Sequence, residues 1–265
     1  MAKAEIGIIG GTGVYDPKLL EIVEEIEVST PYGTPSDKII LGIYAGKKVA
    51  FLPRHGKGHK IPPHKINYRA NISALKELGV KRILAPQAVG SLQEKYKPGD
   101  LVIPEQFFDR TNSRESTFFN GPQVCHISVA EPFCPELRDL LVKTGKNLRY
   151  RIHNGGTYIC VQGPRFSTRA ESELFRKVVK ADIIGMTLVP ECVLAREAEI
   201  CYSSISMITD YDCWKKGRVV STEEILRTVK ANENKVKKIL GEVLQKIPDK
   251  RVKCKCGEAL KGALV

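Results

Sequence analysis

The sequence predicts a single-domain α/β protein whose central mixed β-sheet is flanked by helices on both faces. The chain has 265 residues and a hydrophobic content of 42%, which is enough for one large core. Short apolar runs of strand length alternate with stretches of helical periodicity. No internal repeat or low-complexity linker divides the chain. We place the domain at residues 1–250 and a basic C-terminal tail at residues 251–265.

The first half of the chain predicts several strands and one helix. "EIGIIG" indicates a buried first strand, and "KIILGIYAGKKVAFLP" indicates a hairpin that turns at residues 45–47. The apolar spacing of "INYRANISALKELGV" favours a helix that ends at Gly79. "KRILAPQAVG" and "DLVIPEQFFD" follow as two further strands, before a polar loop over residues 111–121.

The second half continues the alternation of helices and strands. "PELRDLLVKTGKNL" favours a helix with its proline in the first turn. Thr168 and Glu171 form a capping box that opens the helix "RAESELFRKVVK". Ser221 and Glu224 start a long helix that runs to about Ile247. We also predict the helix "PECVLAREAEI" and the strands "GGTYICVQGPR", "ADIIGMT" and "CYSSISMITDYD".

The composition favours a soluble protein with a small anionic ligand. The 42 Lys and Arg outnumber the 30 Asp and Glu, which gives a net charge of +12. The basic residues are spread along the chain beside glutamates, which is typical of solvated helix faces, so we expect no nucleic-acid partner. A positive field still attracts a small anion. We find neither a signal peptide nor an apolar run near the roughly 20 residues of a membrane helix, and expect a cytoplasmic protein that binds no membrane.

Eight cysteines are many for a cytoplasmic protein. Six of them are scattered, and two form a C-x-C in the tail, at Cys254 and Cys256. Zinc sites usually combine C-x-x-C motifs whose spacing recurs along the chain, and this C-x-C has no such companion in the sequence. We therefore expect no metal, and we expect most of the cysteines to be small, buried, apolar residues.

The stretch "GIIGGTGVYD", at residues 7–16, ends a hydrophobic run in a glycine-rich loop. Closely spaced glycines let the backbone approach a ligand, and free N–H groups suit an anion. The loop has no lysine where a P-loop needs one, and Asp16 stands where the dinucleotide fingerprint needs its last glycine. The loop therefore predicts an anion site of neither class, with a plain strand-to-loop turn as the alternative.

Several predicted strands end in polar or glycine residues, and in open α/β sheets ligands bind at the carboxyl ends of the strands. Thr12 and Thr187 each offer a hydroxyl and Arg54 a forked pair of donors, which together suit a phosphate. The three histidines of "RHGKGHKIPPH" lack the Asp, Glu or Cys companions that a zinc site usually has. We therefore predict a phosphate site built without a metal.

The last predicted strand ends in "TDYD", which carries two carboxylates. Asp210 and Asp212 are two residues apart, and on a strand this spacing places both side chains on one face. They follow a buried apolar run, so desolvation and like-charge proximity should raise the pKa of at least one and produce a proton donor near neutral pH. Phosphate donors opposite such an acid indicate attack by phosphate on a carbon whose leaving group is protonated. A capping or solvated pair in a turn is the alternative.

Together these segments resemble the trimeric purine nucleoside phosphorylases, especially the archaeal members that cleave 5'-methylthioadenosine. The motifs include "IGIIGGTG", "RHGKGH", "NYRANISALKELG", "HISVAEPFCPELR", "QGPRFSTRAESELFR" and "GMTLVPECVLAREAEICYSSISMITDYDCW". The resemblance implies phosphorolysis to adenine and 5-methylthioribose 1-phosphate, with inorganic phosphate as co-substrate and no cofactor. A broad purine nucleoside phosphorylase acting on adenosine, inosine and guanosine is the alternative. The family also implies a homotrimer or a dimer of trimers.

The resemblance implies a role for each candidate site residue. The phosphate would lie among Thr12, Arg54, His55, Gln87, Ala88 and Thr187, with His59 nearby. The nucleoside would contact Met186, Phe166, Ser167, Asp210, Tyr211, Asp212, Thr222 and Leu226, and His126 would reach the pocket of a neighbouring subunit. Asp210 would protonate purine N7, and Asp212 would accept a hydrogen bond from a 6-amino group.

Two further expectations follow from this resemblance. Gln87 stands where the family often has a threonine, so we expect a phosphate contact through the backbone N–H of Ala88 or the Gln87 amide. Archaeal members pair their cysteines, which implies disulfides Cys134–Cys201 and Cys254–Cys256.

Two other classes of protein stay open: a basic RNA-binding module, and a hydrolytic nucleosidase that releases free sugar.

Overall fold

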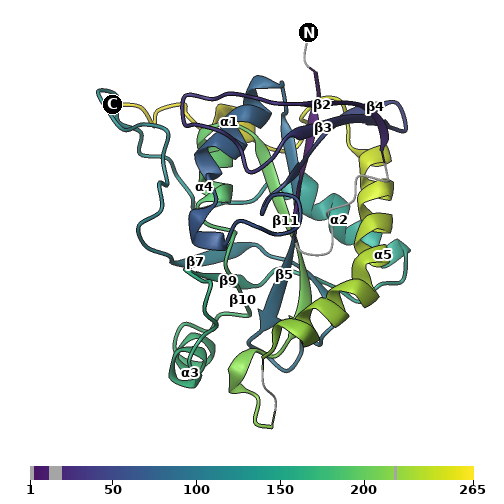
Figure 1. Ribbon diagram of the computed structural model, residues 1–265, viewed down its shortest axis with the longest axis vertical. Helices are drawn as coiled ribbons and strands as arrows, with labels where there is room; N and C mark the ends of the chain where they lie inside the picture. Colours follow the sequence, from purple (N-terminus) through teal and green to yellow (C-terminus); the bar gives the residue numbers. More distant parts are fainter. Residues whose placement is uncertain (1–2, 12–19, 218–219) are drawn as a thin grey trace.

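Figure 1 shows a computed structural model of the protein, which describes residues 3–11, 20–217 and 220–265. Within these residues an 11-stranded mixed sheet forms the centre of the molecule. Helices α1 and α4 lie on one side of this sheet, and helices α2 and α5 lie on the other. The predicted α/β class, with a mixed sheet between two helical layers, is therefore confirmed.

The strands place their carboxyl ends where a site can form. Their bounds are β1 Ile6–Gly10, β2 Glu21–Ile26, β3 Ile39–Tyr44, β4 Lys47–Pro53, β5 Arg82–Ser91, β6 Leu101–Ile103, β7 Gln106–Arg110, β8 Ile152–Asn154, β9 Thr157–Val161, β10 Ile183–Gly185 and β11 Cys201–Asp210. The order is β2-β3-β4-β1-β5-β10-β9-β7, while β11 pairs with β5 and β6, and β6 with β8. Strands β4, β1, β5 and β11 run parallel, so their carboxyl ends meet at one edge.

The helices begin and end at the predicted signals. Their bounds are α1 Tyr68–Glu77, α2 Pro135–Asn147, α3 Arg169–Lys177, α4 Glu191–Glu197 and α5 Thr222–Lys246. Thr168 forms the expected capping box with Glu171, and the Ser221 side chain accepts the backbone N–H of Glu224. Helix α1 stops just before Gly79, whose φ of +90° suits glycine.

Two apolar clusters hold the helices against the sheet. Leu75 of α1 and Leu194 of α4 belong to one cluster, and Leu141 of α2 and Leu240 of α5 belong to the other. All four side chains have an exposed fraction of 0%. Each such burial contributes about 1.5–3 kcal/mol, so the helices are fixed to the sheet by packing.

Some strands differ from the prediction. "DLVIPEQFFD" forms two strands, because β6 pairs with β11 while β7 pairs with β9, and the break falls at Pro104. Proline has no N–H for a ladder and interrupts strands. Strand β10 runs antiparallel to β5. Strands β2, with five exposed positions, and β8, with three residues, were not predicted, because neither shows a buried apolar run.

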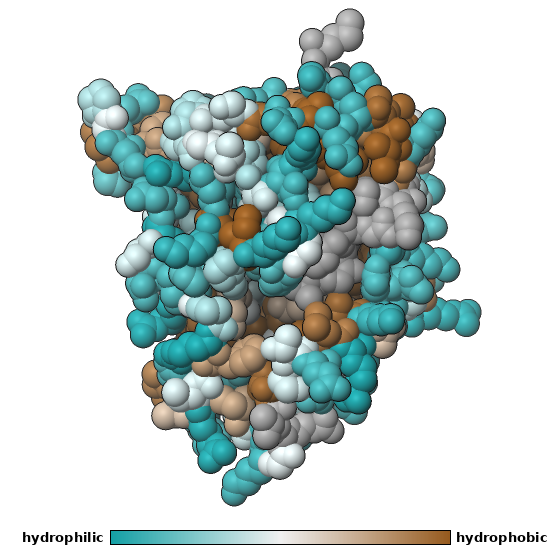
Figure 2. Space-filling model, in the orientation of Figure 1, coloured by the Kyte–Doolittle hydropathy of each residue, from teal (hydrophilic) through white to brown (hydrophobic). Residues whose placement is uncertain are grey.

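The surface is largely hydrophilic on the face in Figure 2, where apolar residues form separate patches. Among the helices in the described part of the chain, none has the length and apolar character needed to cross a membrane.

The cysteines, all within the described residues, are free thiols. Neither of the two disulfides that the resemblance implied is therefore formed. The sulfurs of Cys201 and Cys254 are 3.5 Å apart, whereas a disulfide bond measures about 2.05 Å. Five of the eight thiols are buried, as expected for small apolar residues: Cys134, Cys160, Cys192, Cys201 and Cys256.

Candidate active site

A cavity of about 860 Å³ lies where the parallel strands end. This volume is typical of small-molecule sites. Most predicted site residues line the cavity: Arg54, His55, His59, Gln87, Ala88, Phe166, Ser167, Met186, Thr187, Asp210, Asp212, Thr222 and Leu226. Gly11 of the glycine-rich loop lines it as well. The fold thus brings together side chains that are distant in the sequence.

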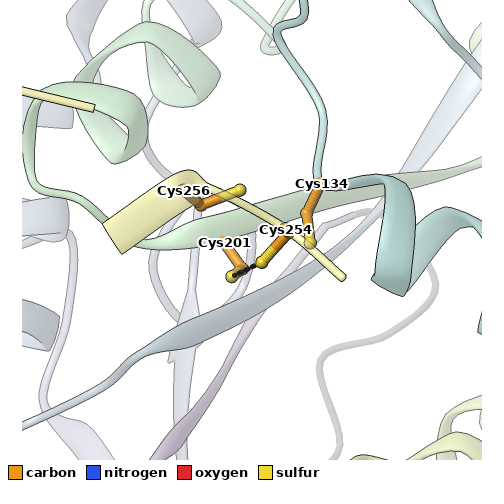
Figure 3. Close-up of side chains that lie close together, drawn as sticks. All are labelled: Cys134, Cys201, Cys254 and Cys256. Atoms are coloured by element: carbon orange, nitrogen blue, oxygen red, sulfur yellow. Dashed lines mark hydrogen bonds between the residues drawn. The ribbon is translucent and has the colours of Figure 1, made fainter. Parts of the chain in front are cut away.

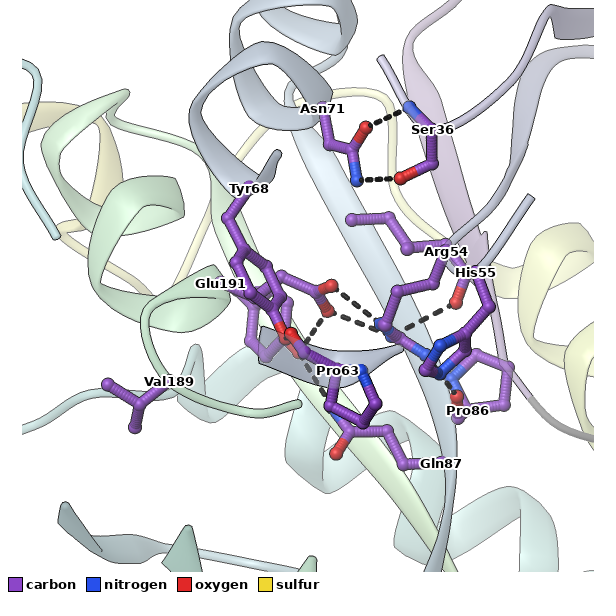
Figure 4. A network of polar contacts seen from close by, with 12 residues as sticks. Ser36, Arg54, His55, Pro63, Tyr68, Asn71, Pro86, Gln87, Val189 and Glu191 are labelled. Carbon is purple, nitrogen blue, oxygen red and sulfur yellow. Dashed lines mark hydrogen bonds and ion pairs between the residues drawn. The ribbon is translucent and has the colours of Figure 1, made fainter. Parts of the chain in front are cut away.

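One end of the cavity is built on a buried ion pair (Figure 4). Arg54 follows β4, and its Nε and Nη2 donate to the two carboxylate oxygens of Glu191 at 2.6 and 2.8 Å. Both side chains are almost fully buried. Burial alone lowers the pKa of Arg54, but the Glu191 carboxylate outweighs it and the net direction is upward. Arg54 therefore stays charged, and Glu191, which the sequence did not reveal, is its fixed partner.

Arg54 keeps one donor for a ligand. Of its five N–H groups, four go to Glu191, Pro86 O and Ile9 O. The fifth is on Nη1, beside Gly11, where an added Cβ would lie only 2.5 Å from this nitrogen. Glycine is thus required here because the guanidinium approaches the backbone closely. The remaining N–H of Arg54 and the hydroxyl of Thr187, which also lines the cavity, are donors that could bind an anion.

The Gln87 amide is held by two tyrosines. Its Oε1 accepts from the Tyr158 hydroxyl at 2.9 Å, and its Nε2 donates to the Tyr202 hydroxyl at 3.1 Å. The Tyr202 hydroxyl in turn donates to Glu191. Gln87 therefore extends the Arg54–Glu191 network, and its amide keeps one N–H for other contacts.

His55 is a neutral imidazole at the same end. Its Nδ1 lies 2.9 Å from Ile61 O, so Nδ1 carries the hydrogen and Nε2 is the acceptor. Burial lowers the pKa of His55 to about 3. Its ring stacks on His59 with 4.1 Å between centroids. A neutral ring with a free acceptor suits a protonated phosphate oxygen or a sugar hydroxyl.

Asp210 ends β11 and lines the same cavity. Its Oδ1 accepts the backbone N–H of Asp212 at 2.7 Å, and its Oδ2 lies 2.7 Å from the Thr209 hydroxyl. The same hydroxyl lies 3.1 Å from Val89 O. Thr209 can donate to an ionised Asp210, or turn to Val89 O and accept from a protonated one. Burial raises the pKa of Asp210, and Thr209 accommodates both of its protonation states.

Asp212 lines the cavity, but it does not share a strand with Asp210 as predicted. Strand β11 stops at Asp210, and Asp212 starts a short 3-10 turn with φ of +49°. The turn, and not the alternation of a strand, directs the Asp212 carboxyl group to the cavity that Asp210 also lines. Burial, and to a lesser extent the Asp210 carboxylate, raises the pKa of Asp212 to about 6. Asp212 is therefore mostly ionised at neutral pH and can accept a hydrogen bond.

The remaining walls are mainly apolar. Met186 and Phe166 come from the segments after β10 and β9. The first turns of α5 contribute a face that carries Thr222, Ile225, Leu226 and Val229. Ile225 and Val229 were not predicted as site residues, although they continue the helical spacing of Thr222 and Leu226 on one face.

Of the predicted residues that the structure describes, two do not line the cavity. Tyr211 packs against Trp214, with ring centroids 5.9 Å apart, because the turn after β11 directs its ring away from the carboxylates. His126 is exposed, and its backbone N–H donates to Ala263 O. Thr12 lies outside the described residues, so its predicted phosphate contact stays a prediction.

One cavity in the mixed α/β fold is thus lined by a buried arginine with a spare N–H donor and by two buried carboxyl groups. Residues 5–245 match the profile of the phosphorylase superfamily, and the chain belongs to that family. It is 57% identical over 99% of its length to S-methyl-5'-thioadenosine phosphorylase of Saccharolobus solfataricus, covering 98% of that protein. The Thermofilum pendens protein of the same name is 55% identical, with both chains fully covered.

Solved structures agree with this assignment. A methylthioadenosine phosphorylase from an antarctic soil metagenomic library superposes with a TM-score of 0.94 at 44% identity, over 100% of this chain and 93% of that one. Methylthioadenosine phosphorylase of Schistosoma mansoni in complex with adenine gives 0.92 at 41% identity, over 98% and 97% of the chains. A mutant of the Schistosoma mansoni adenosine/methylthioadenosine phosphorylase was solved in complex with methylthioadenosine (TM-score 0.91, 41% identity, 98% and 97% covered).

Proposed function

We propose that this protein cleaves S-methyl-5'-thioadenosine by phosphorolysis, giving adenine and 5-methylthioribose 1-phosphate. One observation carries the proposal: a single cavity is lined both by Arg54, which has a spare N–H donor, and by the buried Asp210, whose pKa is raised by burial. The similarity of the whole chain to S-methyl-5'-thioadenosine phosphorylases supports it.

Different residues act on the phosphate and on the purine base. Arg54, Thr187 and the backbone near Ala88 hold the phosphate, whose oxygen attacks C1' of the sugar. The neutral His55 accepts a hydrogen from the phosphate through Nε2. As the glycosidic bond lengthens, negative charge develops on the purine, and Asp210 transfers its proton to N7. Holding the nucleophile in line and neutralising the leaving group are the two tasks that lower this barrier.

The walls favour an adenine base with an apolar 5' substituent. At neutral pH the Asp212 carboxylate accepts from a 6-amino group but repels the oxygen of a 6-oxopurine. Phe166 and Met186 cover the base and the sugar. The α5 face, with Ile225, Leu226 and Val229, suits a methylthio group better than a hydroxyl.

Substrate choice should depend on the charge of Asp212. We expect Asp212→Asn to shift the ratio of kcat/KM for S-methyl-5'-thioadenosine over inosine toward inosine by about ten- to a hundredfold, as expected for a hydrogen bond to a charged group worth about 1.5–3 kcal/mol. An amide can donate to the 6-oxo group, whereas the carboxylate cannot. Because the pKa of Asp212 is about 6, lowering the pH through 6 protonates the carboxyl and should move the parent's ratio the same way. A ratio that does not change with pH between 5 and 7 would contradict this role.

The proposed reaction is tested by kcat/KM for S-methyl-5'-thioadenosine, adenosine and inosine, each with and without phosphate. We expect strict phosphate dependence, with S-methyl-5'-thioadenosine fastest. Comparable rates for inosine would favour a broad purine nucleoside phosphorylase. RNA binding without nucleoside cleavage would contradict the proposal that this protein is an enzyme.

We also propose that the active unit is a homotrimer, or a dimer of trimers, in the cytoplasm and that it serves purine and methionine salvage. His126 is exposed and outside its own cavity, which fits a residue that completes a neighbour's site. Light scattering gives the oligomeric state. If His126 acts across subunits, mixed oligomers of His126→Ala and Asp210→Asn chains should recover part of the activity that each lacks alone.

A further inference from the structure

Four cysteines from three segments that are distant in the sequence converge in space (Figure 3). Cys134 caps α2, Cys201 is the first residue of β11, and Cys254 and Cys256 form the C-x-C near the C-terminus. Their four sulfurs all lie within 4.8 Å of one another. Asp210 stands at the opposite end of the ten-residue β11, about 30 Å away at the rise of a strand.

We propose that this tetracysteine cluster, Cys134, Cys201, Cys254 and Cys256, binds one Zn²⁺ as a closed structural site. Four sulfur ligands are typical of structural zinc. With Zn–S bonds of about 2.3 Å, a tetrahedron has S···S edges of about 3.8 Å. The Cys201–Cys254 separation of 3.5 Å and the 4.8 Å limit for all pairs bracket this edge. The fold thus brings two further cysteine ligands, Cys134 and Cys201, next to the C-x-C, although no motif in the sequence links them to it.

The surroundings of the cluster suit a metal bound to four thiolates. Three of the cysteines are buried, and Cys254 is half-buried, so the site is largely shielded from water. Binding of Zn²⁺ releases the four thiol protons and leaves a centre with a net charge of −2. Arg251 and Lys253 precede the C-x-C and Lys255 lies between its two cysteines, so the segment that supplies two of the ligands is basic, which favours a negatively charged centre. No oxidant or reductant takes part in this step.

The metal would fasten the C-terminal segment to the domain. Glu136 of α2 accepts the backbone N–H groups of Val252 and Lys253. Further along, Ala263 O accepts the backbone N–H of His126. The cluster therefore lies between the body of the protein and the segment that holds the His126 backbone. Loss of the metal should loosen this segment without altering the cavity residues of the same chain.

The test is metal content, measured by mass spectrometry on protein purified under reductant without chelators and then equilibrated with zinc and desalted. We expect one zinc per chain, and we expect Cys254→Ser and Cys256→Ser to bind less than a tenth of it. Cys125→Ser is the matched control, because Cys125 is half-buried like Cys254 but lies outside the cluster; it should keep the full zinc. Replacement of zinc by Co²⁺ should give the visible absorption of tetrahedral thiolate cobalt in the parent and the control alone.

Two results would overturn the proposal. One is protein that binds no zinc although its cluster thiols react freely. The other is protein whose mass, under the same reductant, is lower by the hydrogens lost in two disulfides. Both readouts are independent of nucleoside cleavage, so they do not depend on the proposed function.

Discussion

The Asp210→Asn variant should bind phosphate normally but lose about 10²–10⁴-fold in kcat with S-methyl-5'-thioadenosine, the range of general acid catalysis. Asparagine keeps the size of the side chain and can still accept the N–H of Asp212, but it has no transferable proton. KM for phosphate should change little, because the proposed phosphate ligands are Arg54 and Thr187, which line the same cavity and are unchanged in this variant. Steady-state rates with each substrate varied measure both effects.

A 7-deaza analogue separates proton transfer from a general disturbance of the site. This analogue has no N7 to protonate, so parent and variant should cleave it equally slowly. Asp109→Asn is the control, since Asp109 is exposed and outside the cavity, and its kcat should match the parent. If Asp210→Asn retained kcat within about tenfold of the parent, Asp210 would not be the proton donor.

Glu191→Gln should destabilise the protein by about 3–5 kcal/mol, because it leaves the buried Arg54 charge without its counter-charge. For a chain of this size the expected fall in Tm is about 6–20 °C. Phosphate should raise the Tm of this variant more than that of the parent, since the dianion replaces the lost carboxylate next to Arg54. Thermal unfolding with and without phosphate measures both changes.

Glu197→Gln provides a matched control on the same helix. Glu197 is also buried, but its oxygens accept from the Thr117 hydroxyl and the Phe118 N–H, with no basic side chain among these partners. Burial raises the pKa of Glu197, so replacing its carboxyl group by a neutral amide should lower the Tm only slightly. Phosphate should stabilise this variant no more than the parent. Two results would mean that Arg54 is purely structural: an equal fall in Tm for both variants, or a phosphate-induced rise in the Tm of Glu191→Gln that is no larger than that of the parent.

The position of the site could be predicted because it depends on strand order along the chain. Arg54 and Asp210 follow apolar runs that form parallel strands, and parallel strands end at one edge. Thr187 reaches the same place for another reason. Strand β10 pairs antiparallel with the carboxyl end of β5, where Ile183 is opposite Ser91 and Ile184 is opposite Gly90. The chain that follows β10 therefore runs back along β5 toward Ala88. Thr187 follows a predicted strand end and lines the cavity, although β10 is not one of the parallel strands.

Other features depend on contacts that no local pattern contains. Glu191 begins a short helix in the sequence and looks like an ordinary first-turn acid, yet the fold places it against Arg54. The turn at Asp212 was not predicted, because the strand was expected to continue through Asp212, whereas β11 ends at Asp210. Cys134 and Cys201 are single cysteines in the sequence, and only the packing of α2 and β11 brings them to the C-x-C.

The central claim is that phosphate is a reactant, and ³¹P NMR of the reaction with S-methyl-5'-thioadenosine tests it most directly. The account predicts that the signal of inorganic phosphate is replaced by that of a sugar 1-phosphate, one for each adenine released. Adenine released together with free 5-methylthioribose, while inorganic phosphate is not consumed, would contradict it and identify a hydrolase.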